Sequence, residues 1–280
     1  MKRFVTWLRV GLFLLGTLAV APVQRVVILL GARRAFLLPL IFHRMTLRVL
    51  GIRVRFAGEQ LVEGPALLVS NHVSWLDIPV IGAIAPLVFV AKDDVSSWPG
   101  FGWLAKLQYT VFVARERRTR TMQDGGAIGE RLQLGDRAVL FAEGTSSDGN
   151  RVLPFKSSLV GAVLAGRDTP VRVQPMALVY TGRAGLPLLR RERPFVCWYG
   201  DMTLVPHLLH IFSSPPLDVT IAFGPVMEMA GAAERKQVTA AAHAFVAGAA
   251  MALRNGQQLD IVPSYSKTPS DGLSHAEVAA

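Results

Sequence analysis

One short segment of the chain carries the residues best suited to chemistry, Asn71-His72-Val73-Ser74-Trp75-Leu76-Asp77. A histidine followed by a carboxylate five residues later supplies a general base and a group that can orient it. The segment comes directly after the apolar run Ala66–Val69, which is typical of a buried strand. We therefore expect His72 to lie at a strand end, where its side chain can reach a substrate.

The spacing of His72 and Asp77 restricts how their side chains can meet. Within one α-helix, five residues turn about 500°, which would leave the two on different faces. Pro79 is tolerated in the first turn of a helix, so the helix is predicted to begin near Asp77 and His72 to lie in the preceding loop. Asp77 can then accept a hydrogen bond from one imidazole nitrogen and make the other a stronger base. The alternative is that Asp77 caps the helix and His72 is an ordinary loop histidine.

A second polar segment, Phe141-Ala142-Glu143-Gly144-Thr145-Ser146, follows another strand-like run. Gly144 allows close backbone approach, and the hydroxyl groups can donate hydrogen bonds to anionic oxygens. Arg115 stands at the end of a third predicted strand, and arginine binds phosphate through two parallel hydrogen bonds. Polar residues at several strand ends predict one shared site, although a solvated charged loop would also explain the arginines.

The chain offers no evident nucleophile or metal site. It has no Gly-x-Ser-x-Gly elbow, and Cys197 lies in an apolar run where packing is the expected role. The six histidines include no His-x-x-x-His pair, so no metal ligand is assigned. The remaining chemistry is a base that acts directly on a substrate hydroxyl, whose reaction partner is already activated.

Charge is distributed unevenly along the 280 residues. Residues 1–58 carry ten Lys or Arg and no acidic residue, and the remaining twenty basic residues are balanced by twenty acidic ones. The excess of positive charge therefore lies in the most apolar part of the chain. This pattern favours an anionic membrane surface over nucleic acid as a partner.

The N-terminal segment contains the uncharged run Val10–Gln24 between two arginines. We predict that residues 1–44 form membrane-anchoring helices, retained as an anchor or a half-buried hairpin that breaks near Gly31 or Pro39. A cleaved signal peptide is the first alternative, but Pro22 directly after Ala19-Val20-Ala21 disfavours cleavage. A buried helix of a soluble protein is the second.

Residues 45–256 are predicted to form an α/β domain with a largely parallel sheet flanked by helices, because strand-like and helix-length stretches alternate. Residues 183–217 contain five prolines and are predicted to be irregular, whereas residues 232–255 favour a final helix. The tail, 257–280, is predicted to be disordered. The predicted strands are Ile52–Phe56, Ala66–Val69, Val88–Ala91, Thr110–Val113, Ala138–Phe141, Val171–Val173 and Val219–Phe223.

Together these segments resemble the glycerolipid acyltransferase family, whose best-known members convert lysophosphatidic acid to phosphatidic acid. Four sequence blocks carry the resemblance, in the family's order and spacing. They are Asn-His-x-x-x-x-Asp (Asn71, His72, Asp77), an apolar strand ending in arginine (Phe112, Arg115), Phe-Pro-Glu-Gly-Thr (Phe141, Glu143, Gly144, Thr145) and an apolar strand with proline (Val173, Pro175). Ala142 replaces the proline of the third block, a change that removes no reactive group.

The resemblance implies an enzyme that transfers a fatty acyl chain from acyl-CoA or acyl-acyl carrier protein to a lyso-lipid hydroxyl, without a cofactor. By the resemblance His72 is the base, Asp77 its partner, and the acceptor head group is held by Arg115, Glu143, Gly144, Thr145 and, by position, Lys92. Lysophosphatidic acid is the expected acceptor. Lyso-ornithine lipid is the alternative, because Tyr199–Leu208 resembles bacterial enzymes that acylate it.

The resemblance also implies a place in the bacterial inner membrane, with the active site facing the cytoplasm. Two other classes remain open on the sequence. A non-catalytic lipid-binding protein would not need His72, and a lipid hydrolase would release fatty acid from acyl-CoA without an acceptor.

Overall fold

The computed structural model describes residues 2–31, 36–113, 118–162, 169–231, 233–257 and 259. The strands are β1 (Ile52–Gly58), β2 (Ala66–Ser70), β3 (Val88–Lys92), β4 (Val111–Val113), β5 (Arg137–Phe141), β6 (Val171–Arg183), β7 (Leu186–Pro187), β8 (Leu217–Phe223) and β9 (Met227–Met229). The helices are α1 (Lys2–Leu29), α2 (Leu37–Leu50), α3 (Asp77–Gly82), α4 (Phe101–Leu107), α5 (Arg118–Gln133), α6 (Ser157–Ala162), α7 (Leu204–Ser213) and α8 (Arg235–Arg254), with short 3-10 turns η1 (Asp93–Ser97) and η2 (Arg193–Phe195).

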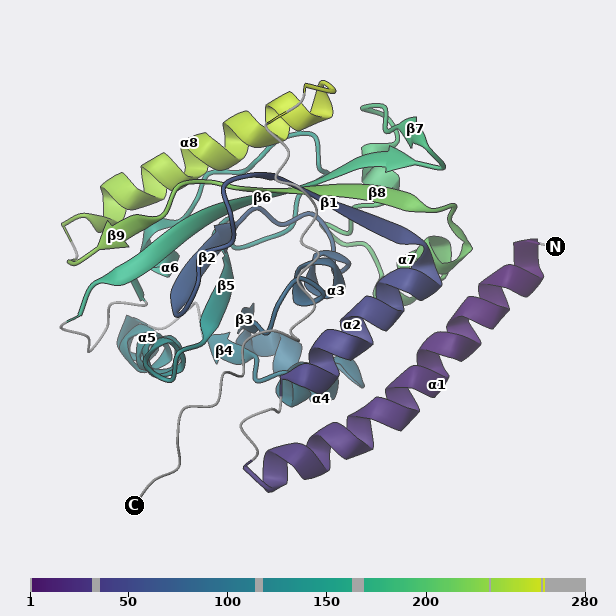
Figure 1. The fold of residues 1–280 in the computed structure, drawn as a ribbon, viewed down its shortest axis with the longest axis horizontal. Helices are drawn as coiled ribbons and strands as arrows, with labels where there is room; N and C mark the ends of the chain where they lie inside the picture. Colours follow the sequence, from purple (N-terminus) through teal and green to yellow (C-terminus); the bar gives the residue numbers. More distant parts are fainter. Residues whose placement is uncertain are drawn as a thin grey trace, which may run out of the picture.

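The strands of the described residues form one sheet in the order β1-β8-β6-β2-β5-β3-β4, with β7 and β9 paired to β6 (Figure 1). Strand β2 runs parallel to both β5 and β6, and β3 runs parallel to β4 and β5. The antiparallel pairs all involve β6. The predicted α/β fold with a largely parallel sheet flanked by helices is confirmed.

Apolar side chains on the two faces of the sheet pack against different helices. On one face, alternate residues of β2 and β5 such as Leu67 and Leu140 pack against α5, α6 and α8. On the other face, residues such as Leu68 and Val139 pack against α2, α3 and α7. Because strand side chains alternate between faces, a continuous apolar run such as β2 is buried on both sides.

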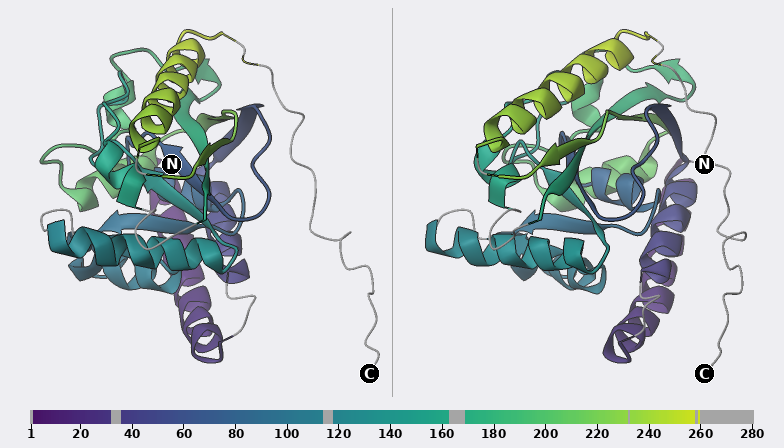
Figure 2. Two further views of the ribbon diagram at one scale, coloured as in Figure 1. Left: turned by 90° about the vertical axis from the view of Figure 1, so that its left-hand side faces the viewer. Right: turned by 60° about the vertical axis from the view of Figure 1, so that its left-hand side comes forward.

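Helices α1 and α2 form the predicted N-terminal pair, on the side of the molecule away from α8 (Figure 2). The first helix ends just before Gly31, whose φ of 62° is easily adopted by glycine, and Pro39 lies in the first turn of α2. The helical part extends to Leu50 rather than to residue 44, because α2 continues until Gly51 closes it in a left-handed conformation.

The outer face of α1 is apolar and exposed along its length. Leu8, Leu15, Leu18 and Leu29 point away from the body, whereas Phe13 and Ala21 face it. Within the described part of the chain, α1 is the one helix long and apolar enough to cross a membrane. Such a surface is typical of a membrane-associated protein.

Two segments differ from the sequence-based expectation. Residues 183–217 are not irregular throughout, since they contain α7 over Leu204–Ser213. The helix has ten residues with Pro206 in its first turn, which is too short for its apolar periodicity to stand out. Strand β6 runs from Val171 to Arg183 instead of ending at Val173, because its second half pairs with β8. Of the predicted disordered tail 257–280, residues 258 and 260–280 lie outside the described residues.

Candidate active site

The register of two neighbouring parallel strands brings the two polar segments together. Ser70 at the end of β2 lies opposite Phe141 at the end of β5, and the Ala142 N–H donates to the Ser70 carbonyl at 3.1 Å. His72 and Glu143 each follow two residues later, and the His72 backbone N–H donates to Glu143 Oε2 at 3.3 Å. The expectation that the strand ends share one site is met for these two residues.

The His72 and Asp77 side chains are joined directly. His72 Nδ1 lies 2.8 Å from Asp77 Oδ2, which also accepts the backbone N–H groups of Val73 at 2.8 Å and Ser74 at 3.0 Å. Helix α3 begins at Asp77, as Pro79 predicted. Because the buried carboxylate accepts the Nδ1 proton, the lone pair of the imidazole is left on Nε2, where it can take a proton.

Tyr180 completes the hydrogen bonds of Asp77 from the far side. Its hydroxyl, on β6, donates to Asp77 Oδ1 at 2.9 Å, and both residues are buried. Burial and the neighbouring Asp77 carboxylate raise the pKa of Tyr180 well above its ordinary value, so the hydroxyl keeps its proton. Sequence reasoning missed Tyr180, because nothing local distinguishes it within an apolar strand.

The imidazole of His72 is also held by stacking on Phe141. Their ring centroids are 4.0 Å apart at an interplanar angle of 21°. Ser147 donates its backbone N–H to the His72 carbonyl at 3.0 Å, so the loop after β5 contacts this residue again. About a fifth of the His72 side chain is exposed (19 %), whereas Asp77 is fully buried. The ring is therefore fixed on one side and accessible on the other.

Glu143 is buried, and its carboxyl oxygens face the protein backbone. Oε1 accepts the Leu153 N–H at 2.9 Å and Oε2 accepts the His72 N–H. Burial raises the pKa of Glu143 to about 8, although these two N–H groups act in the opposite direction. Glu143 thus ties the β5 loop to the His72 backbone, and its predicted contact with a head group stays a prediction.

The other predicted substrate-binding residues are distributed around this edge of the sheet. Gly144 has a φ of 73° and Thr145 is exposed beside it. Lys92 ends β3, the strand next to β5, and forms an ion pair with Asp94. Arg115 lies outside the described residues, so its predicted place beside His72 stays untested.

Cys197 is buried, and burial raises the pKa of its thiol, so the sulfur stays protonated. This environment suits the predicted packing role rather than that of a nucleophile. Across the described residues, no group of three or more His, Cys, Asp or Glu side chains is placed to hold a metal ion.

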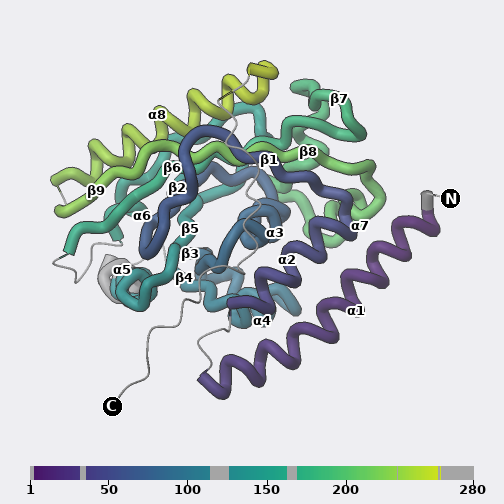
Figure 3. The backbone as a smooth tube through the Cα atoms, in the orientation of Figure 1, coloured from purple at the N-terminus to yellow at the C-terminus, as the bar shows by residue number. Residues whose placement is uncertain are grey.

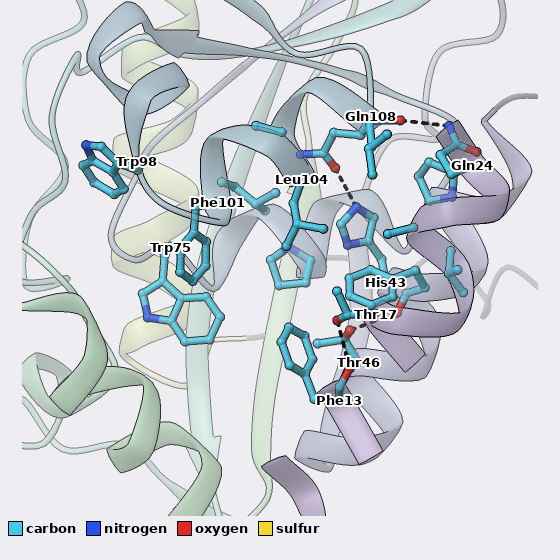
Figure 4. A pocket seen from close by; sticks show the side chains of 18 of the residues that line it. Phe13, Thr17, Gln24, His43, Thr46, Trp75, Trp98, Phe101, Leu104 and Gln108 are labelled. Carbon is cyan, nitrogen blue, oxygen red and sulfur yellow. Dashed lines mark hydrogen bonds between the residues drawn. The ribbon is translucent and has the colours of Figure 1, made fainter. Parts of the chain in front are cut away.

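An apolar cavity of about 170 Å³ lies between the N-terminal helices and the segment that follows His72 (Figure 4). Trp75, Ile78 and Pro79 line it from the loop and α3, while Phe13 and Phe42 line it from α1 and α2. On the side away from Trp75, His43 Nε2 lies 2.8 Å from Gln108 Oε1, and Gln24 Nε2 donates to the Leu107 carbonyl at 2.8 Å. The walls are otherwise almost wholly apolar, which suits a hydrocarbon chain.

Comparison with known proteins places the chain in a family. The family model described as Acyltransferase matches residues 53–179, which include His72, Asp77 and Glu143. The lyso-ornithine lipid O-acyltransferase of Rhizobium meliloti (strain 1021) is 44 % identical over 84 % of this chain and 83 % of its own length. The 1-acyl-sn-glycerol-3-phosphate acyltransferase of Neisseria gonorrhoeae is 34 % identical over 64 % of this chain and 67 % of its own length.

A solved structure supports the fold. The crystal structure of the 1-acyl-sn-glycerophosphate acyltransferase from Thermotoga maritima matches with a TM-score of 0.64 at 20 % identity, covering 91 % of this chain and 98 % of that one. The sequence resemblance, the family model and the long match to the Rhizobium meliloti protein agree with one another. This chain belongs to the acyltransferase family and is an acyltransferase enzyme.

Proposed function

We propose that the chain transfers a fatty acyl group from an acyl thioester to the free hydroxyl of lyso-ornithine lipid. The observation that carries the proposal is the His72–Asp77 pair, with Asp77 buried and His72 accessible at the edge of the sheet. His72 Nε2 takes the proton of the lyso-lipid hydroxyl while the hydroxyl oxygen bonds to the thioester carbonyl carbon. The carbon–sulfur bond then breaks, and the imidazolium returns the proton to the leaving thiolate.

The choice of acceptor rests on the relatives. The match to the Rhizobium meliloti protein, named for lyso-ornithine lipid, is longer and closer than the match to the Neisseria gonorrhoeae protein, named for 1-acyl-sn-glycerol-3-phosphate. This reverses the order expected from the sequence, in which lysophosphatidic acid came first. Lysophosphatidic acid remains the second candidate, because the same base and the same thioester chemistry would acylate it.

The head group of the acceptor would lie at the edge of the sheet where β2, β3 and β5 end. Arg115, Lys92, Gly144 and Thr145 are the proposed contacts, with Glu143 holding the loop that carries the last two. Thr145 is exposed beside the buried Glu143, so its hydroxyl is available to a ligand. The acyl chain would enter the apolar cavity, which Trp75 lines three residues after His72 in the chain. Acyl-CoA or acyl-acyl carrier protein would serve as donor, and no cofactor is required.

The protein would lie on the cytoplasmic leaflet of the bacterial inner membrane rather than cross it with α1. The inner side of α1 is bound to the domain near both ends, by Arg9 to the Phe212 and Ser214 carbonyls and by Gln24 to the Leu107 carbonyl. These contacts hold α1 against the domain and favour a helix that lies on the membrane over one that spans it. Its exposed apolar face would instead enter one leaflet, with Arg3 and Arg25 near the head groups.

The test is an acceptor panel read by mass spectrometry. Purified protein in detergent or vesicles is given acyl-CoA or acyl-acyl carrier protein with lyso-ornithine lipid, with lysophosphatidic acid, or with no acceptor. We expect the wild type to produce acylated ornithine lipid. A folded His72→Ala variant should show an acyl-transfer rate about 10² to 10⁴-fold lower.

Each other result points elsewhere. If lysophosphatidic acid were acylated and lyso-ornithine lipid were not, lysophosphatidic acid would be the acceptor. Free fatty acid formed without an acceptor would indicate a hydrolase. An unchanged acyl-transfer rate in a folded His72→Ala variant would rule out His72 as the general base.

A further inference from the structure

Trp75 lies in the loop that joins His72 to Asp77, and its side chain contacts residues outside that loop. Asp77 fixes the loop from inside by accepting N–H groups from Val73 and Ser74. Trp75 instead donates its indole N–H to His207 Nδ1 at 2.9 Å, and the two rings meet edge to face at 88°. The loop that carries the general base therefore has an external attachment as well as an internal one.

His207 reaches this position from the segment between β7 and β8. It lies in the first half of α7 and is 5 % exposed. The same segment contacts the loop a second time, through the backbone N–H of Trp198, which donates to the Val73 carbonyl at 2.8 Å. Since residues 198 and 207 both contact residues 73–75, α7 and the chain before it form the outer wall of the loop.

The other end of α7 is held by the N-terminal helix. Arg9 of α1 donates to the Phe212 carbonyl at 3.1 Å and the Ser214 carbonyl at 2.7 Å, at the C-terminal end of α7, and Phe13 packs edge-on against Phe212. A cation at this end of a helix is favourable because the last carbonyl groups have no intrahelical partner. Helix α7 thus contacts α1 through its C-terminal end, and in the trace of Figure 3 it lies nearer to the N-terminal half of α1 than to the C-terminal half.

We infer that His207 is a positioning residue for the acyl transfer: by accepting the Trp75 indole N–H, its Nδ1 fixes the His72 loop against α7. The inference rests on the proposed function. A general base must lie within hydrogen-bond reach of the proton that it removes, and a displacement of about 1 Å can lower the rate about 10²-fold. Without the His207 acceptor, the indole N–H loses its partner, and the bond from the Trp198 backbone N–H to the Val73 carbonyl is left as the loop's remaining hydrogen bond to this segment among those described.

The protonation state of His207 suits an acceptor. Burial, and secondarily the nearby His210, lower the pKa of His207 to about 4. The imidazole is therefore neutral near pH 7 and can keep a lone pair on Nδ1. A neutral His207 can therefore accept the Trp75 N–H near pH 7.

The test compares two replacements of His207 that differ in one property. Asparagine places its amide oxygen near the position of Nδ1 and can accept the Trp75 N–H, whereas leucine fills space but accepts nothing. We expect His207→Leu to lower kcat about tenfold with KM for both substrates within about twofold, and His207→Asn to restore most of kcat. His210→Leu on the same helix is the matched control and should keep wild-type kcat.

A double-variant cycle separates this pair from general packing. Trp75→Phe removes the donor and keeps an aromatic ring, so it should lower kcat about as much as His207→Leu. The double variant should be no worse than either single one, because both remove the same bond. Additive losses, an asparagine variant as impaired as leucine, or wild-type kcat in His207→Leu would each overturn the inference while leaving the proposed acyl transfer intact.

A measurement that does not depend on catalysis keeps the inference testable even if lyso-ornithine lipid is not the substrate. The chain has five tryptophans, and Trp75→Phe identifies the indole N–H signal of Trp75 by its loss from an NMR spectrum. That signal should exchange slowly with solvent in the wild type and in His207→Asn, and faster in His207→Leu. Equal exchange in all three proteins would show that the bond does not hold the loop.

Discussion

Tyr180 and Asp77 lie 103 positions apart in the sequence, yet the tyrosine hydroxyl donates to the Asp77 carboxylate at 2.9 Å. Strand β6 therefore contacts one oxygen of the carboxylate, while the His72 loop contacts the other. With donors on both of its oxygens, the buried Asp77 can keep a fixed orientation and, through it, that of the imidazole.

Tyr180→Phe should weaken this support. The change removes one donor and leaves Asp77 Oδ1 without its partner in a buried site, which costs about 1–3 kcal/mol of unfolding free energy. Urea denaturation measures the loss, and kcat should fall with it. Tyr199→Phe is the control, because it changes a tyrosine that does not bond to Asp77. Its denaturation midpoint and kcat should differ little from those of the wild type. An unchanged denaturation midpoint in Tyr180→Phe would contradict the structural role.

Asp77→Asn should impair catalysis more than folding. The amide can still accept backbone N–H groups, but it cannot stabilise the imidazolium that forms when His72 takes a proton. We expect kcat to fall about 10² to 10⁴-fold while the circular dichroism spectrum stays that of the wild type. A variant that folds and retains wild-type kcat would exclude the proposed role of the pair.

Glu143→Gln should change how stability depends on pH. Burial raises the pKa of Glu143 from 4.5 to about 8, so between these values the folded state holds a proton that the unfolded state has released. The protonated side chain's contribution is complete below about pH 4.5 and is lost as the pH rises towards 8. Glutamine does not titrate, so the urea midpoint of the variant should decline less than that of the wild type over this range. Exposed Glu59→Gln is the control, and parallel curves for the Glu143 variant and the wild type would contradict the expectation.

Ala105→Phe should shorten the acyl chains that the enzyme accepts. Ala105 lines the apolar cavity from α4, and a phenyl group there would occupy part of its roughly 170 Å³. We expect the preferred donor in a mixture of acyl thioesters to shift towards shorter chains, measured from the mass of the lipid product. Lys106→Phe, at the exposed neighbouring position, is the matched control. An unchanged product profile would mean that the acyl chain binds elsewhere.

The local part of the site was predictable because it depends on short stretches of backbone. Pro79 fixes where α3 can begin, which puts His72 in a loop five residues before the helix carboxylate, and the structure has this arrangement. Apolar runs likewise predicted the cores of β2 and β5, whose ends carry His72 and Glu143. Helix α7 was not predicted, because ten residues with a proline give too weak a periodicity.

The sequence by itself determined the residue types, the strand and helix that flank His72, and the family resemblance, since all of these are encoded in neighbouring residues. Only the tertiary structure decided that Tyr180 reaches Asp77, that His207 accepts the Trp75 N–H, and that Glu143 faces the backbone instead of solvent. These contacts join positions 71 to 132 residues apart. They depend on the register of β2, β5 and β6 and on the packing of α7, which no short stretch of sequence specifies.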